Sequence, residues 1–529
     1  MNTSDIADGL KLTAKLMELH NENPFKIRSL SNAAFRLDKS GIDIIPLSLE
    51  DLSKIEGIGK GIAGKIVEFR EQGTTEELKA LVEMTPAGVI EMMSIKGIGP
   101  KKVAVLWKEL GVESVGELLY ACRENRLVGL KGFGAKTQEQ VKKGIEFLQI
   151  NAGKFHYAAA EPIAERILEE MKKEHPGKLI SLTGEYRRKC EILDHIDILL
   201  EASSAGVEEI IVEGKRIIVV SVTKQDFFKR LIETTGNEDF LMEMGEIPAA
   251  ESEKAIFQKL GMKETPPELW ESTAFVKLAR SGEIPELIDF KDLRGCLHNH
   301  STWSDGLHSL EDMAFHCKEK GYEYFGICDH SRTASYAGGL SIENVVEQQE
   351  EIDQLNDSLA PFRIFKGIES DILGDGSLDY PDDILKAFDI VVASIHQNLK
   401  MEEEKAMKRL LRAIENPFTT ILGHPTGRLL LSREGYPIDH KKIIDACAAN
   451  GVAIELNAHP WRLDIDWRWV PYCMEKGVMI SINPDAHEKD GIYDMYYGVL
   501  VARKGMLTKE YCLNALGRKD FEKWLAKRR

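Results

Sequence analysis

The sequence predicts a multidomain protein in which an all-helical segment, an α+β segment and a segment of alternating strands and helices follow one another. With 529 residues, the chain is too long for a single hydrophobic core. Apolar residues recur at helical spacing in residues 1–150 and alternate as in strands in residues 179–202. From residue 291 onward, short apolar runs alternate with helical stretches, as in a sheet or barrel of βα units. We expect domain boundaries that give segments 1–80, 81–150, 151–245, 246–290 and 291–529.

The charge and the cysteine content of the chain limit the cellular compartment and the binding partners that we expect for it. The formal net charge is −17, but residues 1–150 carry 21 basic and 21 acidic side chains. Binding of nucleic acid there would rely on local geometry rather than on a broad basic surface. The 8 cysteines are scattered without a C-x-x-C pair, which is typical of a reducing cytoplasm. Because no apolar run approaches the ~20 residues of a membrane helix and no secretory signal is evident, we expect a cytoplasmic protein without a membrane partner.

A glycine motif occurs three times in the helical segment, as IEGIGKGIAGKI (55–66), IKGIGPKKVAVL (95–106) and LKGFGAKTQEQV (130–141). Each is an apolar residue, a G-x-G turn and a new helix with lysine in its first turn, which is the helix-hairpin-helix pattern. The free N–H groups at such a helix start bind anions, and glycine lets a DNA backbone come close. The alternative is that the glycines only close tight helical hairpins. The predicted contacts to DNA phosphates, which carry no sequence information, are Gly57, Gly59, Lys60, Gly97, Gly99, Lys101, Lys102, Gly132, Gly134 and Lys136.

Together with NPFKIRSLSNAAF (23–35), these motifs resemble the N-terminal DNA-binding region of family X DNA polymerases. In that family a lysine of the first hairpin's second helix can act as a Schiff-base nucleophile on an abasic sugar. The resemblance places Lys65 at this position. A helical lysine near DNA is more often only a phosphate contact.

The middle segment resembles the palm of the same polymerases over LISLTGEYRRKCEILDHIDILLEA (179–202), and GMKETPPELWES (261–272) resembles their thumb. The family's Gly-Ser motif, which holds the triphosphate, is here Gly184-Glu185. Its Asp-x-Asp pair is reduced to Asp197, because His195 replaces the first acid. The strand RIIVVSV (216–222), which should supply a third acid, contains none. The residual palm positions are Gly184, Arg187 and Asp197.

Loss of these acids predicts loss of polymerase activity. Magnesium prefers anionic oxygen ligands, and neutral imidazole suits it poorly. Without two of three carboxylates, the charge that holds both metals of a phosphoryl-transfer site is missing. We expect a palm that positions DNA without extending primers; the alternative is an active but atypical family X polymerase.

In the last segment, several predicted strands end in side chains that bind metals. Examples are LRGCLHNH, YFGICDH and DIVVASIH. In βα barrels the chemistry lies at the carboxyl ends of the strands. One such histidine would more often be a core residue, but repetition after six strands favours a shared site. The candidate ligands are His298, His300, Asp305, His330, Glu369, His396, His424, Asp485 and His487.

This pattern resembles the PHP (polymerase and histidinol phosphatase) domain, which implies a distorted (β/α)7 barrel over residues 291–529 with three divalent metal ions. Carried over by position, one metal takes His298, His300, Glu369 and Asp485; a second takes Glu369, His396 and His424; the third takes Asp305, His330 and His487. A donor set rich in nitrogen fits Mn²⁺ or Zn²⁺. Such ions generate hydroxide near neutral pH and neutralise charge on a phosphate ester. Arg428 and Arg462 are candidate phosphate clamps, with structural salt bridges as the alternative.

The order of these parts resembles the bacterial PolX architecture. The resemblance implies a DNA-repair phosphodiesterase: a metal-dependent 3′–5′ exonuclease that processes gapped or 3′-end DNA in base-excision repair. Two other functions remain open. One is a small-molecule phosphatase of the histidinol-phosphatase type, which would not explain the hairpins. The other is a non-catalytic DNA-binding scaffold, which the complete set of ligand residues argues against.

Overall fold

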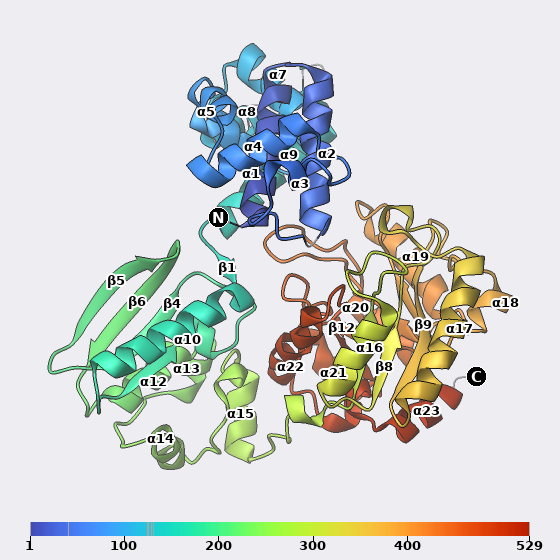
Figure 1. The fold of residues 1–529 in the computed structure, drawn as a ribbon. Helices are drawn as coiled ribbons and strands as arrows, with labels where there is room; N and C mark the ends of the chain where they lie inside the picture. Colours follow the sequence, from blue (N-terminus) through green and yellow to red (C-terminus); the bar gives the residue numbers. More distant parts are fainter. Residues whose placement is uncertain (1, 41, 124–125, 129, 131, 528–529) are drawn as a thin grey trace. The chain divides into compact units, whose positions relative to one another are not determined.

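The computed structural model describes residues 2–40, 42–123, 126–128, 130 and 132–527. The chain forms two compact units, Met1–Ala152 and Gly153–Arg529. Figure 1 shows helices alone in the first unit, and strands together with helices in the second. Among the described residues, no helix combines the length and apolar character that crossing a bilayer requires.

The first unit is helical, as the spacing of its apolar residues predicted. Its core contains Leu10, Met17, Ile66 and Leu106, all fully buried. A capping box between Asn2 and Asp5 fixes the start of the first helix. The helices are α1 (Thr3–Leu19), α2 (Pro24–Ser40), α3 (Leu49–Leu52), α4 (Lys60–Gln72), α5 (Glu76–Glu83), α6 (Ala87–Met92), α7 (Pro100–Leu110), α8 (Val115–Arg123) and α9 (Ala135–Asn151).

The second unit begins with a four-stranded sheet in the order β2-β4-β6-β5. Strand β4 (Ile196–Glu201) pairs antiparallel with β2 (Ile180–Thr183) and parallel with β6 (Lys215–Val222), and β5 (Gly206–Val212) is the edge strand. A short pair, β1 (Phe155–His156) and β3 (Ile192–Leu193), lies beside it. The helices of this region are α10 (Tyr157–Glu174), α11 (Gly184–Arg187), α12 (Phe227–Thr235), α13 (Glu238–Met244), α14 (Glu253–Lys259) and α15 (Thr273–Ser281).

The remainder of the second unit is a seven-stranded parallel sheet in the order β13-β12-β11-β10-β9-β8-β7. A parallel bridge between Asn299 and Ala486 joins the two edges, so the barrel is nearly closed. Because helices cover its outer face, its strands are buried on both faces and read as continuous apolar runs. The strands are β7 (Gly295–Asn299), β8 (Tyr324–Ile327), β9 (Arg363–Asp371), β10 (Ile390–Ser394), β11 (Ile421–Leu422), β12 (Ala453–Asn457) and β13 (Ile480–Asn483).

Helices connect the barrel strands and complete the expected alternation of βα units. They are α16 (Leu310–Glu319), α17 (Ile342–Leu359), α18 (Asp382–Leu385), α19 (Glu403–Ile414), α20 (His440–Asn450), α21 (Val470–Glu475), α22 (Met495–Lys504) and α23 (Arg518–Ala526). The helical first segment, the α+β middle segment and the parallel barrel together confirm the predicted multidomain fold class.

A buried ion-pair network joins the barrel to the preceding part of the second unit. The ammonium of Lys504 on α22 lies 3.0 Å from Glu191 and 3.3 Å from Glu271. Glu271 also accepts from Arg188 at 3.2 Å. Burial alone would lower the pKa of Lys504, but Glu191 and Glu271 outweigh it, so the amine stays charged. Removing one partner would leave a buried charge uncompensated, which costs free energy. The intact network therefore holds the two parts together.

Candidate metal centre in the barrel

The carboxyl ends of the parallel strands bring the candidate ligands together around one side chain, Glu369 on β9. Its Oε1 lies 3.0 Å from His424 Nε2 and 3.1 Å from His396 Nε2. The same oxygen is 3.3 Å from His298 Nε2. Its Oε2 lies 2.9 Å from His330 Nδ1 and 3.7 Å from His300 Nε2. A carboxylate surrounded in this way can bridge cations held on either side of it.

Asp485 and Asp305 complete the cluster. Asp485 Oδ1 is 3.0 Å from His300 Nε2 and 3.8 Å from His298 Nε2. Asp305 Oδ1 is 3.2 Å from His487 Nε2 and 3.6 Å from His330 Nε2. All nine side chains predicted as ligands therefore lie in one connected cluster.

Two ligand positions have a backbone conformation that L residues rarely adopt. His298 has φ 57° and Asp485 has φ 53°. This left-handed conformation costs non-glycine residues about 1–2 kcal/mol and persists only where the surrounding structure imposes it. At His298 the conformation coincides with a register shift in β7 between Cys296 and Asn299. This irregularity of β7 lies where the rings of His298 and His300 both approach Glu369.

Three groups within the cluster have donor atoms that all lie within 4.8 Å of one another, the arrangement that a single cation requires. They overlap with the three expected ligand sets without coinciding with them. His300 joins the group expected for the third metal, and His330 takes the place expected for His424 beside Glu369 and His396. The groups are His300, Asp305, His330 and His487; His298, His300 and Asp485; and His330, Glu369 and His396.

The buried polar atoms of the cluster fit divalent cations. Among the described residues, His298 Nε2, both ring nitrogens of His300 and Glu369 Oε2 are buried without a hydrogen bond, although carboxylates and imidazoles lie close by. Buried polar groups are nearly always satisfied, so orphaned donors and acceptors facing one another require an explanation. A shared cation supplies it, because ligands of one metal approach each other without hydrogen bonding.

The charges of the ligands favour metal binding too. Burial, reinforced by His487 and His330, lowers the pKa of His300 to about 3, so this ring is neutral with lone pairs available. Burial would raise the pKa of Glu369, but His396, His298 and His330 hold it well below its ordinary value. Asp485 behaves in the same way beside His298. The site therefore presents fixed anions and neutral imidazole, which are the states that bind cations.

Besides His298, whose pKa Glu455 and Glu369 raise well above its ordinary value despite burial, two further imidazoles carry protons that a metal must displace. Burial alone would lower their pKa, but Glu369 and Asp371 raise that of His396 to about 10, and Asp305 and Asp485 raise that of His487 to about 9. Both rings are thus charged at neutral pH without a metal. We expect metal binding to release protons and the apparent affinity to rise with pH up to about 10, the pKa of His396. Calorimetric titration of Mn²⁺ in buffers of different ionisation enthalpy measures this release; a binding enthalpy independent of the buffer would contradict it.

Residues that the sequence analysis missed surround these ligands. Glu455 on β12 is fully buried, and its Oε1 lies 2.5 Å from His298 Nδ1. Its Oε2 accepts a 2.7 Å hydrogen bond from the backbone N–H of His424. Asp371 on β9 contacts His396 Nδ1 at 2.5 Å. Carboxylates in this position fix the orientation and basicity of a ligating imidazole. The available signal was the Glu-x-Asn at the end of AIELN (453–457), an acid in an otherwise apolar strand.

Replacing Glu455 by glutamine is therefore expected to weaken Mn²⁺ binding about 10- to 100-fold, because His298 loses the carboxylate that orients it. Calorimetry or equilibrium dialysis of the full chain measures the affinity. Glu323→Gln is the matched control, since this carboxylate accepts from the Arg518 N–H at 3.0 Å at the other end of the barrel. Equal affinities of Glu455→Gln and the control would contradict the assigned role.

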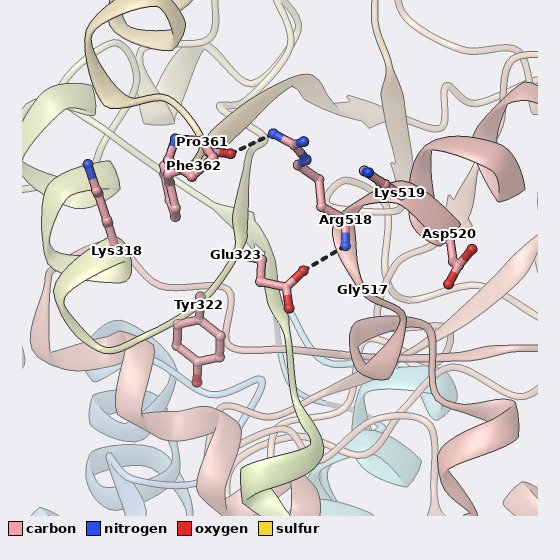
Figure 2. A pocket seen from close by; sticks show the side chains of 9 residues that line it. All are labelled: Lys318, Tyr322, Glu323, Pro361, Phe362, Gly517, Arg518, Lys519 and Asp520. Atoms are coloured by element: carbon pink, nitrogen blue, oxygen red, sulfur yellow. Dashed lines mark hydrogen bonds between the residues drawn. The ribbon is translucent and has the colours of Figure 1, made fainter.

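One cavity that adjoins the barrel lies away from this cluster. This cavity has a volume of about 550 Å³ and lies where β8 and β9 begin. Its lining residues, drawn in Figure 2, include Tyr322 and Glu323 before β8 and the residues at the start of α23. There the Arg518 guanidinium donates to the Pro361 carbonyl at 2.5 Å. Because the candidate ligands are at the opposite ends of the strands, this cavity is separate from them.

The two arginines predicted as phosphate clamps differ in their surroundings. Arg428 donates to the Arg462 and Leu463 carbonyls and forms a 2.8 Å ion pair with Asp466. Each of the three nitrogens of Arg428 thus has a partner within the protein, which favours the structural alternative; a phosphate clamp at Arg428 remains a prediction. Arg462 lies beside the cluster, with Nε 3.7 Å from Asp485 Oδ2, so a phosphate clamp at Arg462 remains a prediction.

In the residual palm, Asp197 has an imidazole beside it and a guanidinium nearby. His195 Nε2 lies 3.2 Å from Asp197 Oδ2, and this contact raises the pKa of His195. Arg216, the residue of β6 opposite His195, approaches its Nδ1 at 3.4 Å. The strand that was expected to supply a third acid thus carries the guanidinium of Arg216. Gly184, with φ +64°, has no room for a side chain because Asp197 lies against it.

Two further palm side chains are bound within the protein. Arg187 forms a bidentate ion pair with Glu253 at 2.8 and 2.6 Å. Glu185, at the position of the family's serine, accepts from the backbone N–H of Asp194 at 3.0 Å.

The three glycine motifs share one local geometry in the first unit. The first glycine of each has positive φ, at Gly57, Gly97 and Gly132. Gly59, Gly99 and Gly134 cap α4, α7 and α9 without a side-chain hydrogen bond to the first turn. The helix N-termini therefore keep N–H groups available to an anion. Lys60, Lys101 and Lys136 are exposed and Lys102 is partly buried, whereas Lys131 lies outside the described residues.

Lys65, the predicted lyase residue, is engaged in an ion pair. Its Nζ lies 2.5 Å from Glu77 Oε2, and Lys26 contacts the same carboxylate. An amine held in this way must leave its partner before it attacks a sugar carbon. This geometry gives the lyase hypothesis no support.

Comparisons with known proteins agree with this description. Residues 1–75 match a helix-hairpin-helix domain model, residues 89–146 a SAM-like helix-hairpin-helix tandem, and residues 297–459 the PHP domain. Fold and site thus define a protein with helix-hairpin-helix modules and a PHP metallo-phosphoesterase barrel.

The chain belongs to the PolX family. It is 35% identical to the DNA polymerase/3′-5′ exonuclease PolX of Bacillus subtilis (strain 168) over 570 aligned residues, which cover 99% of each chain. Probable phosphatases match a smaller part. One from Thermoanaerobacter sp. (strain X514) is 27% identical over 41% of this chain and 88% of its own length. One from Acetivibrio thermocellus is 28% identical over 38% of this chain and 84% of its own length.

Proposed function

We propose that this protein is a DNA-repair phosphodiesterase whose barrel trims 3′ ends as a metal-dependent 3′–5′ exonuclease. The observation that carries the proposal is the ring of imidazoles and acids around Glu369. Its donors suit up to three divalent ions, with Mn²⁺ or Zn²⁺ favoured by the many nitrogens. Such ions supply Lewis-acid stabilisation of phosphate charge and a nucleophile at neutral pH. The 3.7 Å distance from Arg462 Nε to Asp485 Oδ2 supports a phosphate contact by Arg462.

In the proposed division of labour, segments 1–80 and 81–150 hold the DNA backbone irrespective of sequence. Segment 151–245 is a palm that positions DNA, 246–290 is a thumb-like connection, and 291–529 is the hydrolytic PHP domain. The hairpin glycines and exposed lysines support the first assignment, since they leave N–H groups and positive charge facing outward. Membership of the PolX family supports the order of these parts.

The direct test is hydrolysis of a 3′-recessed duplex labelled at its 5′ end, with Mn²⁺, Zn²⁺ or Mg²⁺ added to metal-stripped protein. We expect stepwise shortening from the 3′ end with Mn²⁺ or Zn²⁺. Absence of shortening with every metal would contradict the proposal.

The match to probable phosphatases favours a small-molecule phosphatase as the second candidate. Rates on a phosphomonoester and on the duplex separate the two functions. A higher kcat/KM for the monoester would favour the phosphatase.

We further propose that the palm does not incorporate nucleotides. Asp197 is accompanied by His195 at 3.2 Å, and Arg216 approaches His195 at 3.4 Å, so an imidazole and a guanidinium occupy the surroundings in which Mg²⁺ needs anions. We expect nucleotide incorporation to be at the background level in the purified wild type and to stay there in Asp197→Ala. Templated extension of a primer by the wild type, lost in Asp197→Ala, would show instead that the palm is active.

A further inference from the structure

One aromatic side chain stands out on the loop that follows β12. Trp461 is 53% exposed, and within the fully described range 452–467 every other residue is buried or half-buried. Single exposed apolar residues are common and need no explanation by themselves. The contacts around Trp461, however, connect this residue to the candidate metal centre.

The backbone at Trp461 is held on both sides. Its N–H donates to His459 Nδ1 at 3.2 Å, and its carbonyl accepts from the Leu430 N–H at 2.6 Å. The carbonyl of the next residue, Arg462, accepts from Arg428 Nε at 2.9 Å. The hydrogen bond from Arg428 thus helps to fix the backbone of the loop, so the backbone that carries the indole has a defined position.

The same loop runs along Asp485, one of the candidate ligands. Asn457 Nδ2 donates to Asp485 Oδ2 at 3.0 Å, and the His459 N–H donates to Asn457 Oδ1 at 3.1 Å. Arg462 then approaches Asp485 Oδ2 at 3.7 Å. Trp461 is therefore bracketed in sequence by residues that contact Asp485 or its partner, at the edge of the cluster.

A second aromatic ring supports the indole from the palm side of the unit. His156 on β1 stacks on Trp461 with ring centroids 5.6 Å apart and an interplanar angle of 13°. Its Nε2 donates to the Leu430 carbonyl at 3.1 Å, which fixes the ring. Burial lowers the pKa of His156, so the ring is neutral at physiological pH. His459 meets the indole edge-on at 6.1 Å and 85°. With 53% of its surface exposed, Trp461 keeps room for another flat group.

We propose that Trp461 is the platform on which the base of the 3′-terminal nucleotide stacks while its phosphodiester lies at the metal centre, an inference that rests on the proposed exonuclease function. A nucleobase is the flat group that a DNA end presents next to its scissile phosphate. Stacking on an aromatic ring tolerates every base, because each base has a π face. This matches a nuclease that holds DNA by its backbone. It also gives the palm a role, since its β1 supplies the supporting ring.

The kinetic test compares Trp461→Ala with wild type on two 3′-recessed duplexes that differ only in the last residue, an ordinary nucleotide or an abasic sugar. We expect kcat/KM for the ordinary end to fall about 10- to 100-fold, and that for the abasic end to stay unchanged. Trp461→Phe should restore most of the loss. Equal losses on both ends, or no loss on either, would overturn the platform and show that Trp461 only packs between palm and barrel.

A binding test is independent of hydrolysis. A DNA overhang with 2-aminopurine as its 3′-terminal base is mixed with full-length protein in EDTA, and we expect its fluorescence to be quenched by wild type but not by Trp461→Ala. Trp469→Ala is the matched control, because it removes another Trp–His stack of the barrel, with His440 at 4.7 Å and 6°. Equal quenching by wild type and Trp461→Ala would overturn the platform. If the wild type quenched the fluorescence but hydrolysed no DNA end, base stacking on Trp461 would be supported and the proposed exonuclease function would be contradicted.

Discussion

Replacing Glu369 by glutamine is expected to abolish hydrolysis of DNA 3′ ends, with a fall in kcat of about 10³-fold or more. Five imidazoles lie within 3.7 Å of its two carboxylate oxygens, so the neutral amide removes the negative charge that these five rings share. Stabilisation of phosphate charge by metals contributes several kcal/mol, which corresponds to a loss of this size. Single-turnover rates on a labelled duplex measure the effect. DNA affinity should be nearly unchanged, because the hairpins lie in the other unit.

Asp305→Asn and His300→Ala should behave like Glu369→Gln, since each removes a donor from one of the clustered groups. Asp375→Asn is a suitable control, because this exposed carboxylate pairs with Arg412 at 2.7 Å away from the cluster. A Glu369→Gln protein with the hydrolysis rate of the control would contradict a bridging role for Glu369.

Removing residues 1–152 is expected to raise KM for a 3′-recessed duplex about 100-fold or more, while kcat/KM for bis(p-nitrophenyl) phosphate stays the same. The first unit carries the three glycine motifs, and loss of several phosphate contacts weakens DNA binding by orders of magnitude. The truncation falls between the two compact units, so the barrel and its ligands keep their own core. Initial rates on both substrates measure the separation.

A variant of the full chain makes the same test without truncation. Changing Lys60, Lys101 and Lys136 to alanine should lower the slope of log affinity against log salt by about one for each lysine. Lys79, which pairs with Glu76 on α5 at 2.8 Å, is the control position. An unchanged salt slope, or an unchanged KM after truncation, would show that the hairpins do not hold the DNA.

The sequence predicted best those features of the fold and the site that follow from residue spacing and strand direction. Parallel strands place their carboxyl ends together, so His330, Glu369 and His396 could be assigned to one site before any contact was known. The helical first unit followed from the spacing of residues such as Leu10 and Leu106. The barrel's nearly complete closure rests on a single bridge, between Asn299 and Ala486, which no local pattern encodes.

Other features depend on long-range contacts that spacing cannot reveal. Glu455 reads as part of an apolar strand, and only the fold brings it 2.5 Å from His298. Arg428 resembled a phosphate clamp because it follows a ligand-bearing strand, but Asp466 and two carbonyls engage it. The ion pair of Lys65 with Glu77 was equally hidden, since the two residues belong to different helices.

Anomalous scattering from Mn²⁺ in crystals of the full-length protein measures most directly whether cations gather around Glu369. We expect peaks within coordination distance of Glu369, Asp485 and Asp305, shared with the surrounding histidines, and loss of at least one peak in Glu369→Gln crystals. Crystals that bind Mn²⁺ only elsewhere, or show no peak in the barrel while the same protein shortens DNA, would contradict hydrolysis at this centre.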